Sequence, residues 1–193
     1  GANHNAVGDE GNNNTEDLDN NGINDLNQNN ITRLASITGK ADLGLKTEDN
    51  AKLIKAKLQK LSEYPDSNAA PKHLSMDLIC FRLEVPPGEK ALLRLHTYVD
   101  LPEDGIWHKW VCGKGWMDFT NSVEQKGPRL AILKLRDGGP GDADGAVNGW
   151  IVDPVSVSPR YGSSEGQKNS NDHSSSGSGG CIYVSTSDSA AGW

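Results

Sequence analysis

Apolar residues occupy every second position along several short runs in the middle of the chain, and this period of two most constrains the fold. The runs 79–85 and 91–99 both show it. Successive side chains of a strand point to opposite faces, so the alternation predicts strands with one buried face. Residues 86–89, Pro-Pro-Gly-Glu, predict a turn between the two runs. We therefore expect the pair to form a β-hairpin.

Further β-prone runs at 130–135 and 150–152 follow Gly- and Asp-rich loops. Several short strands separated by turns predict an all-β protein, an antiparallel β-sandwich. We expect four regions: an Asn/Asp-rich leader (1–30), the sandwich (31–160), a Gly/Ser-rich linker (161–180) and a strand-forming tail (181–193). An isolated tail strand must pair with a sheet edge, its own or that of another copy, or stay disordered.

One segment of the expected sandwich is ambiguous between helix and strand. Residues 49–61 carry Leu53, Ile54, Ala56 and Leu58 among lysines. This spacing fits one face of an amphipathic helix. The periodicity alone therefore favours a helix.

Charge and motif content exclude several function classes. The formal net charge of −7 argues against nucleic acid or an anionic membrane as partner. No run approaches the roughly 18 apolar residues of a membrane helix, so we expect no transmembrane segment. The chain also lacks the sequence motifs of serine hydrolases, zinc proteases and kinases. We expect a protein that is not an enzyme.

The leader contains a calcium-type spacing of oxygen ligands. Side-chain oxygens occur at positions one, three, five and nine of a loop, with glycine at six and an apolar residue at seven, whose carbonyl would be the ligand. Gly22 would allow the sharp bend, and the Ile23 side chain would anchor the loop on the fold. The predicted Ca²⁺ ligands are Asp17, Asp19, Asn21, Ile23 and Asp25. A solvated Asn/Asp-rich leader is the alternative.

A second acidic loop, 137–154, has the sequence Asp-Gly-Gly-Pro-Gly-Asp-Ala-Asp-Gly-Ala-Val-Asn-Gly-Trp-Ile-Val-Asp-Pro. Its carboxylates would repel phosphate, so a nucleotide loop is excluded. Asp137, Asp142 and Asp144 could bind a second Ca²⁺, or they could simply cap turns. We interpret Asp153, just before Pro154, as a turn residue.

The stretch 81–154 resembles the choice-of-anchor U domain of bacterial surface proteins. The shared elements are Phe-x-Leu-x-Val-Pro-Pro-Gly (81–88), Trp-Met-Asp-Phe (116–119), the acidic glycine-rich run 137–145 and Ile-Val-Asp-Pro (151–154). The resemblance implies export and display on the bacterial cell surface, and it favours a strand for residues 49–61. The family is defined by its architecture more than by an activity.

Cysteines and tryptophans leave two further choices open. Export permits a disulfide between Cys80 and Cys112, which would leave Cys181 unpaired, and two buried free thiols are the alternative.

Trp107, Trp110 and Trp116 could form a sugar-stacking platform, but a core position is favoured in a sandwich with few large apolar residues.

These features predict a non-catalytic, calcium-binding extracellular structural or adhesion module, with cell-surface components or other copies of itself as partners. The first alternative is a subunit that assembles into a filament or sheath by strand donation. A carbohydrate-binding module is the third possibility.

Overall fold

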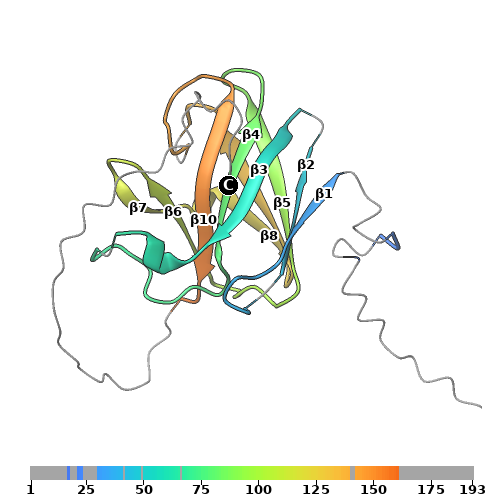
Figure 1. Ribbon diagram of the computed structural model, residues 1–193, viewed down its shortest axis with the longest axis vertical. Coiled ribbons are helices and arrows are strands. Elements are labelled where there is room, and N and C mark those ends of the chain that lie inside the picture. The colour runs from blue at the N-terminus through green and yellow to red at the C-terminus, as the bar shows by residue number, and fades with distance from the viewer. Residues whose placement is uncertain are drawn as a thin grey trace, which may run out of the picture.

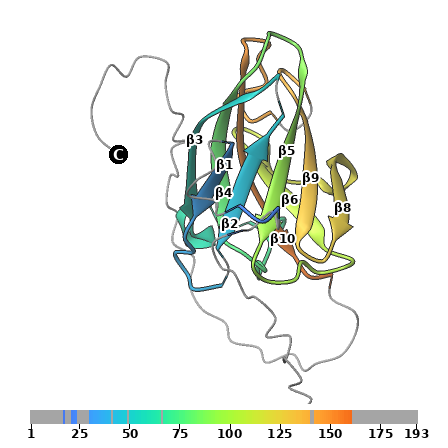
Figure 2. The ribbon, with the colours of Figure 1, turned by 90° about the vertical axis from the view of Figure 1, so that its right-hand side faces the viewer.

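The computed structural model describes Asp17 and residues 21–23, 30–40, 42–48, 50–65, 67–139 and 142–160. Its strands form two antiparallel sheets of five strands each, which pack against each other face to face (Figures 1 and 2). The predicted all-β sandwich is confirmed, and its strands run from Ile31 to Ser158. No helix in this part of the chain is long and apolar enough to cross a membrane.

The first sheet has the strand order β1-β2-β5-β9-β8 and the second β3-β4-β10-β6-β7. The first contains β1 (Ile31–Leu34), β2 (Leu43–Thr47), β5 (Lys90–Thr97), β8 (Val123–Gly127) and β9 (Leu130–Arg136). The second contains β3 (Lys52–Gln59), β4 (Leu78–Glu84), β6 (Ile106–Val111), β7 (Gly115–Asp118) and β10 (Trp150–Ser158). Two 3₁₀ turns, η2 (Leu61–Glu63) and η3 (Thr120–Ser122), lie in the connections.

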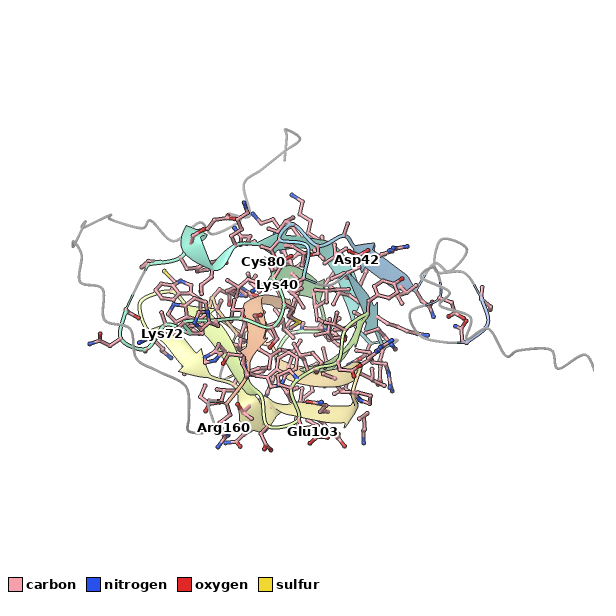
Figure 3. All side chains as sticks on the ribbon, turned by 90° about the horizontal axis from the view of Figure 1, so that it is seen from below. Lys40, Asp42, Lys72, Cys80, Glu103 and Arg160 are labelled. Carbon is pink, nitrogen blue, oxygen red and sulfur yellow. The ribbon has the colours of Figure 1, made fainter. Side chains whose placement is uncertain are left out.

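The main core lies between the sheets and consists of the inward-facing residues of both. Leu83 of β4, Leu93 of β5 and Ile151 of β10 are completely buried, whereas Glu84 beside Leu83 is exposed. Viewed from one end, side chains fill the space between the two layers (Figure 3). The alternation along the sequence therefore follows from burial of one face of each strand.

The hairpin predicted for the runs 79–85 and 91–99 is wrong. Strand β4 pairs with β3 and β10, whereas β5 pairs with β2 and β9, so the two strands belong to different sheets. The Pro-Pro-Gly turn crosses from one layer to the other. Alternation shows which face of a strand is buried, but it is the same for strands that pair in one sheet and strands that face each other across a core.

Residues 52–59 form an edge strand, β3, and not the helix that their periodicity favours. A β-bulge between Leu53 and Lys55 shifts the register against β4. Because of this bulge, Leu53, Ala56 and Leu58 all face the core. Their spacing of three and then two residues imitates a helical repeat, which explains the ambiguity.

A smaller aromatic cluster covers the outer face of the second sheet. Trp110 and Trp116 are cross-strand partners on β6 and β7, with ring centroids 5.6 Å apart. The Tyr64 ring lies 6.0 Å from Trp110 and 5.5 Å from Trp116. The predicted core position is confirmed for Trp107, in the main core, and for Trp116, while Trp110 is half-buried against Tyr64.

The predicted Cys80–Cys112 disulfide is not formed, because Cys80 is a free thiol. Cys80 lies in β4 and Cys112 follows β6, and β10 runs between these strands. Two strand spacings amount to about 10 Å, beyond the roughly 7 Å that a disulfide allows between Cα atoms. The Cys80 thiol donates to Gln59 Oε1, and burial raises its pKa to about 12. Cys112 is disulfide-bonded, and its partner lies outside the described residues.

Candidate functional site

The N-terminal loop shows the turn that its ligand spacing requires, in the part that the structure describes. The Asp17 carboxylate accepts the backbone N–H of Asn21 at 3.1 Å and that of Gly22 at 2.7 Å. The Asn21 side-chain oxygen accepts the N–H of Ile23 at 2.8 Å. Gly22 has φ +83°, which a residue with a side chain rarely adopts, so the predicted need for glycine is confirmed. Positions one and five of the loop are thus held together.

Not every predicted feature of this loop is found. Ile23 is 52% exposed, and its predicted role in anchoring the loop stays a prediction. Asp19 and Asp25 lie outside the described residues. Among the residues that are described, no group of three or more His, Cys, Asp or Glu side chains could hold a metal ion. Calcium binding at this loop stays a prediction.

The second acidic loop connects β9 to β10 and lies at the same end of the sandwich as the β4–β5 turn (top of Figure 1). Gly138 has φ +68°, and a Cβ atom there would lie 2.4 Å from Val147 Cγ2. Both the backbone angle and the crowding therefore require glycine. The side chains of Asp137 and Asp142 turn inward and are 1% and 4% exposed.

Asp137 ties three segments together through backbone N–H groups. Its Oδ2 accepts from Gly88 in the β4–β5 turn at 2.7 Å and from Gly149 at 3.0 Å. Its Oδ1 accepts from Asn148 at 3.3 Å. Burial alone would raise the pKa of Asp137, but these donors outweigh burial and hold the pKa below its usual value. Both carboxylate oxygens of Asp137 accept hydrogen bonds from backbone N–H groups of the loop and the neighbouring turn, which favours the turn-capping interpretation of this residue.

Asp142 and Asp144 are also engaged by the loop. Asp142 accepts the N–H of Gly138 at 2.9 Å and that of Val152 in β10 at 3.2 Å. Asp144 accepts the N–H of Ala146 at 2.9 Å and the side-chain amide of Asn148 at 2.9 Å. These contacts support turn capping here too, and a second calcium site at Asp137, Asp142 and Asp144 stays a prediction.

Stability should depend on pH through Asp142. Burial raises the pKa of Asp142 to about 6, against the opposing effect of its two N–H donors. Because the folded-state pKa exceeds the unfolded one, this contribution to stability is complete below about pH 4 and is lost as pH rises through 6. Between about pH 5 and pH 7 the loss should be about 1 kcal/mol. Urea denaturation of the native chain and of Asp142→Asn across this range measures it, and an equal pH slope in both would contradict the assignment.

A buried lysine–aspartate pair lies beneath this loop, and the sequence interpretation missed it. Lys109 of β6 and Asp153 of β10 bring Nζ and Oδ2 to 2.7 Å, with both side chains at most 1% exposed. Asp153 is therefore not the turn residue that we predicted. Pro154 lies within β10, opposite Cys80 of β4. A proline is tolerated there because β10 pairs with β6 only from Val155 onward, so no backbone N–H is needed at position 154. The sequence did contain a signal for this pair. Lys109 occupies the same alternating positions as the apolar residues Trp107 and Val111, which indicates that its side chain lies on the buried face of the strand.

A serine and a histidine also meet on the outer face of the second sheet. His108 Nε2 lies 2.7 Å from Ser158 Oγ, and burial lowers the pKa of His108. Asp118 pairs with His108 across the β6–β7 ladder, but its Oδ1 accepts the N–H of Thr120 at 2.8 Å. A hydrolytic triad needs the acid to orient the imidazole. This pair therefore gives no positive support to an enzyme.

Comparison of the chain with protein families, with curated proteins and with solved structures found no match. The resemblance to the choice-of-anchor U domain therefore rests on the motif residues alone.

Proposed function

We propose that this protein is a non-catalytic, calcium-binding structural module displayed on the outside of a bacterial cell. The observation that carries the calcium part is the pair of hydrogen bonds from Asn21 and Gly22 to the Asp17 carboxylate. These bonds close a turn at the start of the predicted ligand loop, and a tight turn is what wrapping a cation with alternate residues requires. Export and display follow from the motif resemblance, and the net charge of −7 agrees with a hard cation as ligand.

Calcium titration by calorimetry tests the proposal. The full chain should bind Ca²⁺ with a dissociation constant of about 10⁻⁴–10⁻³ M, because position twelve is Gln28 and not the usual bidentate glutamate. Asp17→Ala should weaken binding at least about tenfold, since it removes one carboxylate ligand and the acceptor that closes the turn.

The matched control is Glu103→Gln, which removes one charge from an exposed residue of the β5–β6 connection (labelled in Figure 3). This variant should bind calcium as the native chain does. If Asp17→Ala leaves the affinity unchanged, or if neither protein releases or absorbs heat with calcium, the loop is not a calcium site.

Surface display needs a separate measurement. Antibodies against the sandwich should label intact bacteria that produce the full protein as strongly as permeabilised ones. Labelling that requires permeabilisation would contradict the proposed surface display, and it would leave the proposal of calcium binding unaffected.

The strand-donation alternative gains no positive support from the four described edge strands. Strands β1 and β7 have four residues each. Strand β3 carries three lysines and a bulge, and β8 has an irregularity between Gln125 and Gly127. Short, charged or bulged edges discourage pairing with another chain. The tail 181–193, which would donate the strand, lies outside the described residues.

A carbohydrate-binding function is also less well supported. Of the three tryptophans considered as a platform, Trp107 and Trp116 are only 2% and 6% exposed. Buried rings cannot present a face to a sugar.

A further inference from the structure

The Lys109–Asp153 pair faces the main core beneath the second acidic loop, where both groups interact with Asp142. Its neighbours on the same faces are Ile151 and Val155 along β10 and Trp107 and Val111 along β6, all of them buried. The Lys109 ammonium lies 4.3 Å from the centre of the Phe119 ring. A lysine and an aspartate thus share an apolar environment from which solvent is excluded.

The pair is in contact but poorly satisfied. Within the described part of the chain, neither Lys109 Nζ nor either oxygen of Asp153 has a hydrogen bond of good geometry, although Nζ and Oδ2 are 2.7 Å apart. A buried ion pair offsets the loss of hydration only when further hydrogen bonds satisfy both groups. As a salt bridge, this contact is therefore a weak source of stability.

The surroundings make the uncharged form of the Asp153 carboxyl more accessible than it is for an exposed aspartate. Burial raises the pKa of Asp153 to about 6, against the opposing effect of Lys109, and the negative charge of Asp142 raises it further. Asp142 is itself buried, and its carboxylate interacts with the charge of Lys109 as well. Transfer of a proton from the ammonium to Asp153 would give a neutral amine beside a neutral carboxylic acid in a medium of low polarity.

We propose that Lys109 and Asp153 form an intramolecular amide bond that links β6 to β10. The lone pair of the neutral Nζ attacks Cγ of the protonated carboxyl, and a C–N bond forms. The C–O bond to the hydroxyl then breaks, and the hydroxyl leaves as water with a proton from nitrogen. The products are one amide and one water molecule, so the step needs no oxidant, reductant or cofactor.

The strands hold the reacting groups in place. Strand β10 pairs with β6 from Val155, opposite Lys109, onward. Asp153, two residues before Val155, is the diagonal neighbour of Lys109 on the same face, a position within reach of a long side chain. Both strands are internal to their sheet, so neither side chain can move away without disturbing the core. Such fixed proximity replaces a bimolecular encounter.

The amide would also remove the energetic difficulty of the pair. It replaces two buried ionic groups by one neutral group with a single N–H and a single carbonyl, whose burial costs much less. It would further cross-link two neighbouring strands covalently, which restricts the unfolded chain. This inference does not depend on calcium binding or on surface display.

Mass spectrometry of the full-length chain tests the proposal. After several days in the folded state, the reduced and denatured protein should weigh less than its sequence mass by one water molecule. A protease digest should contain a branched peptide that joins Lys109 to Asp153. An intact sequence mass overturns the proposal, as does a water loss that maps elsewhere, for example to the Asp104–Gly105 step, where a cyclic imide can form.

Three variants sharpen this test. Lys109→Arg and Asp153→Ala should each have the full mass of their sequences and lack the branched peptide. Lys126→Arg is the matched control, because Lys126 contacts Glu124 in an exposed ion pair, and it should lose one water as the native chain does. If the core variants fail to fold, the mass and the branched peptide of the unsubstituted chain still decide. A branched peptide that persists in Lys109→Arg would also overturn the assignment.

Discussion

Asp137→Ala should lower the free energy of unfolding by about 3–5 kcal/mol, because three backbone N–H groups lose their acceptor in a buried place. These groups belong to Gly88, Asn148 and Gly149. They lie in the β4–β5 turn and in the loop just before β10, so the substitution loosens two loops at once. Urea denaturation at neutral pH, with the midpoint and slope both fitted, measures the change.

The matched control is Asp144→Ala, the same substitution seven positions further on in the same loop. Asp144 is partly exposed and accepts hydrogen bonds from the backbone of Ala146 and the side chain of Asn148. Its loss should cost about 1 kcal/mol, the usual effect of losing a turn cap. Equal destabilisation by the two substitutions would contradict the organising role of Asp137.

Trp107→Ala should destabilise the sandwich by about 3–5 kcal/mol, since it removes a large buried side chain and leaves a cavity. Trp107 is 2% exposed and belongs to the main core between the sheets. Its backbone also holds the segment after β7, because its carbonyl accepts the N–H of Phe119 at 2.7 Å. Those backbone contacts persist in the variant, so the effect reports mainly on packing. Thermal and urea unfolding should both show the loss.

Trp150→Ala serves as the comparison, because Trp150 is half-buried on the outer face of β10. Arg82 stacks over its ring at 3.8 Å. Truncation there removes one stacking contact and no core volume, so the expected cost is about 1 kcal/mol. A loss at Trp107 no larger than that at Trp150 would place Trp107 outside the energetic core.

Much of the architecture follows from local sequence, because each strand buries one face. The period of two in residues 79–85, 91–99 and 130–135 predicts strands, and β4, β5 and β9 occupy these positions. The glycine at position six of the leader loop follows from the turn itself, and Gly22 has the positive φ that this turn needs. These features depend on neighbours along the chain, so sequence alone determines them.

Only the tertiary structure decides which distant segments meet. Alternation cannot distinguish pairing within a sheet from packing across the core, and for that reason the expected β4–β5 hairpin is a crossing between layers. The bulge in β3 and the separation of Cys80 from Cys112 by β10 likewise depend on strand order. Lys109 and Asp153 lie 44 positions apart in the sequence and come within 2.7 Å of each other only because β6 and β10 are neighbours in the folded sheet. Contact between them is a property of strand order and register, which no local pattern of residues specifies.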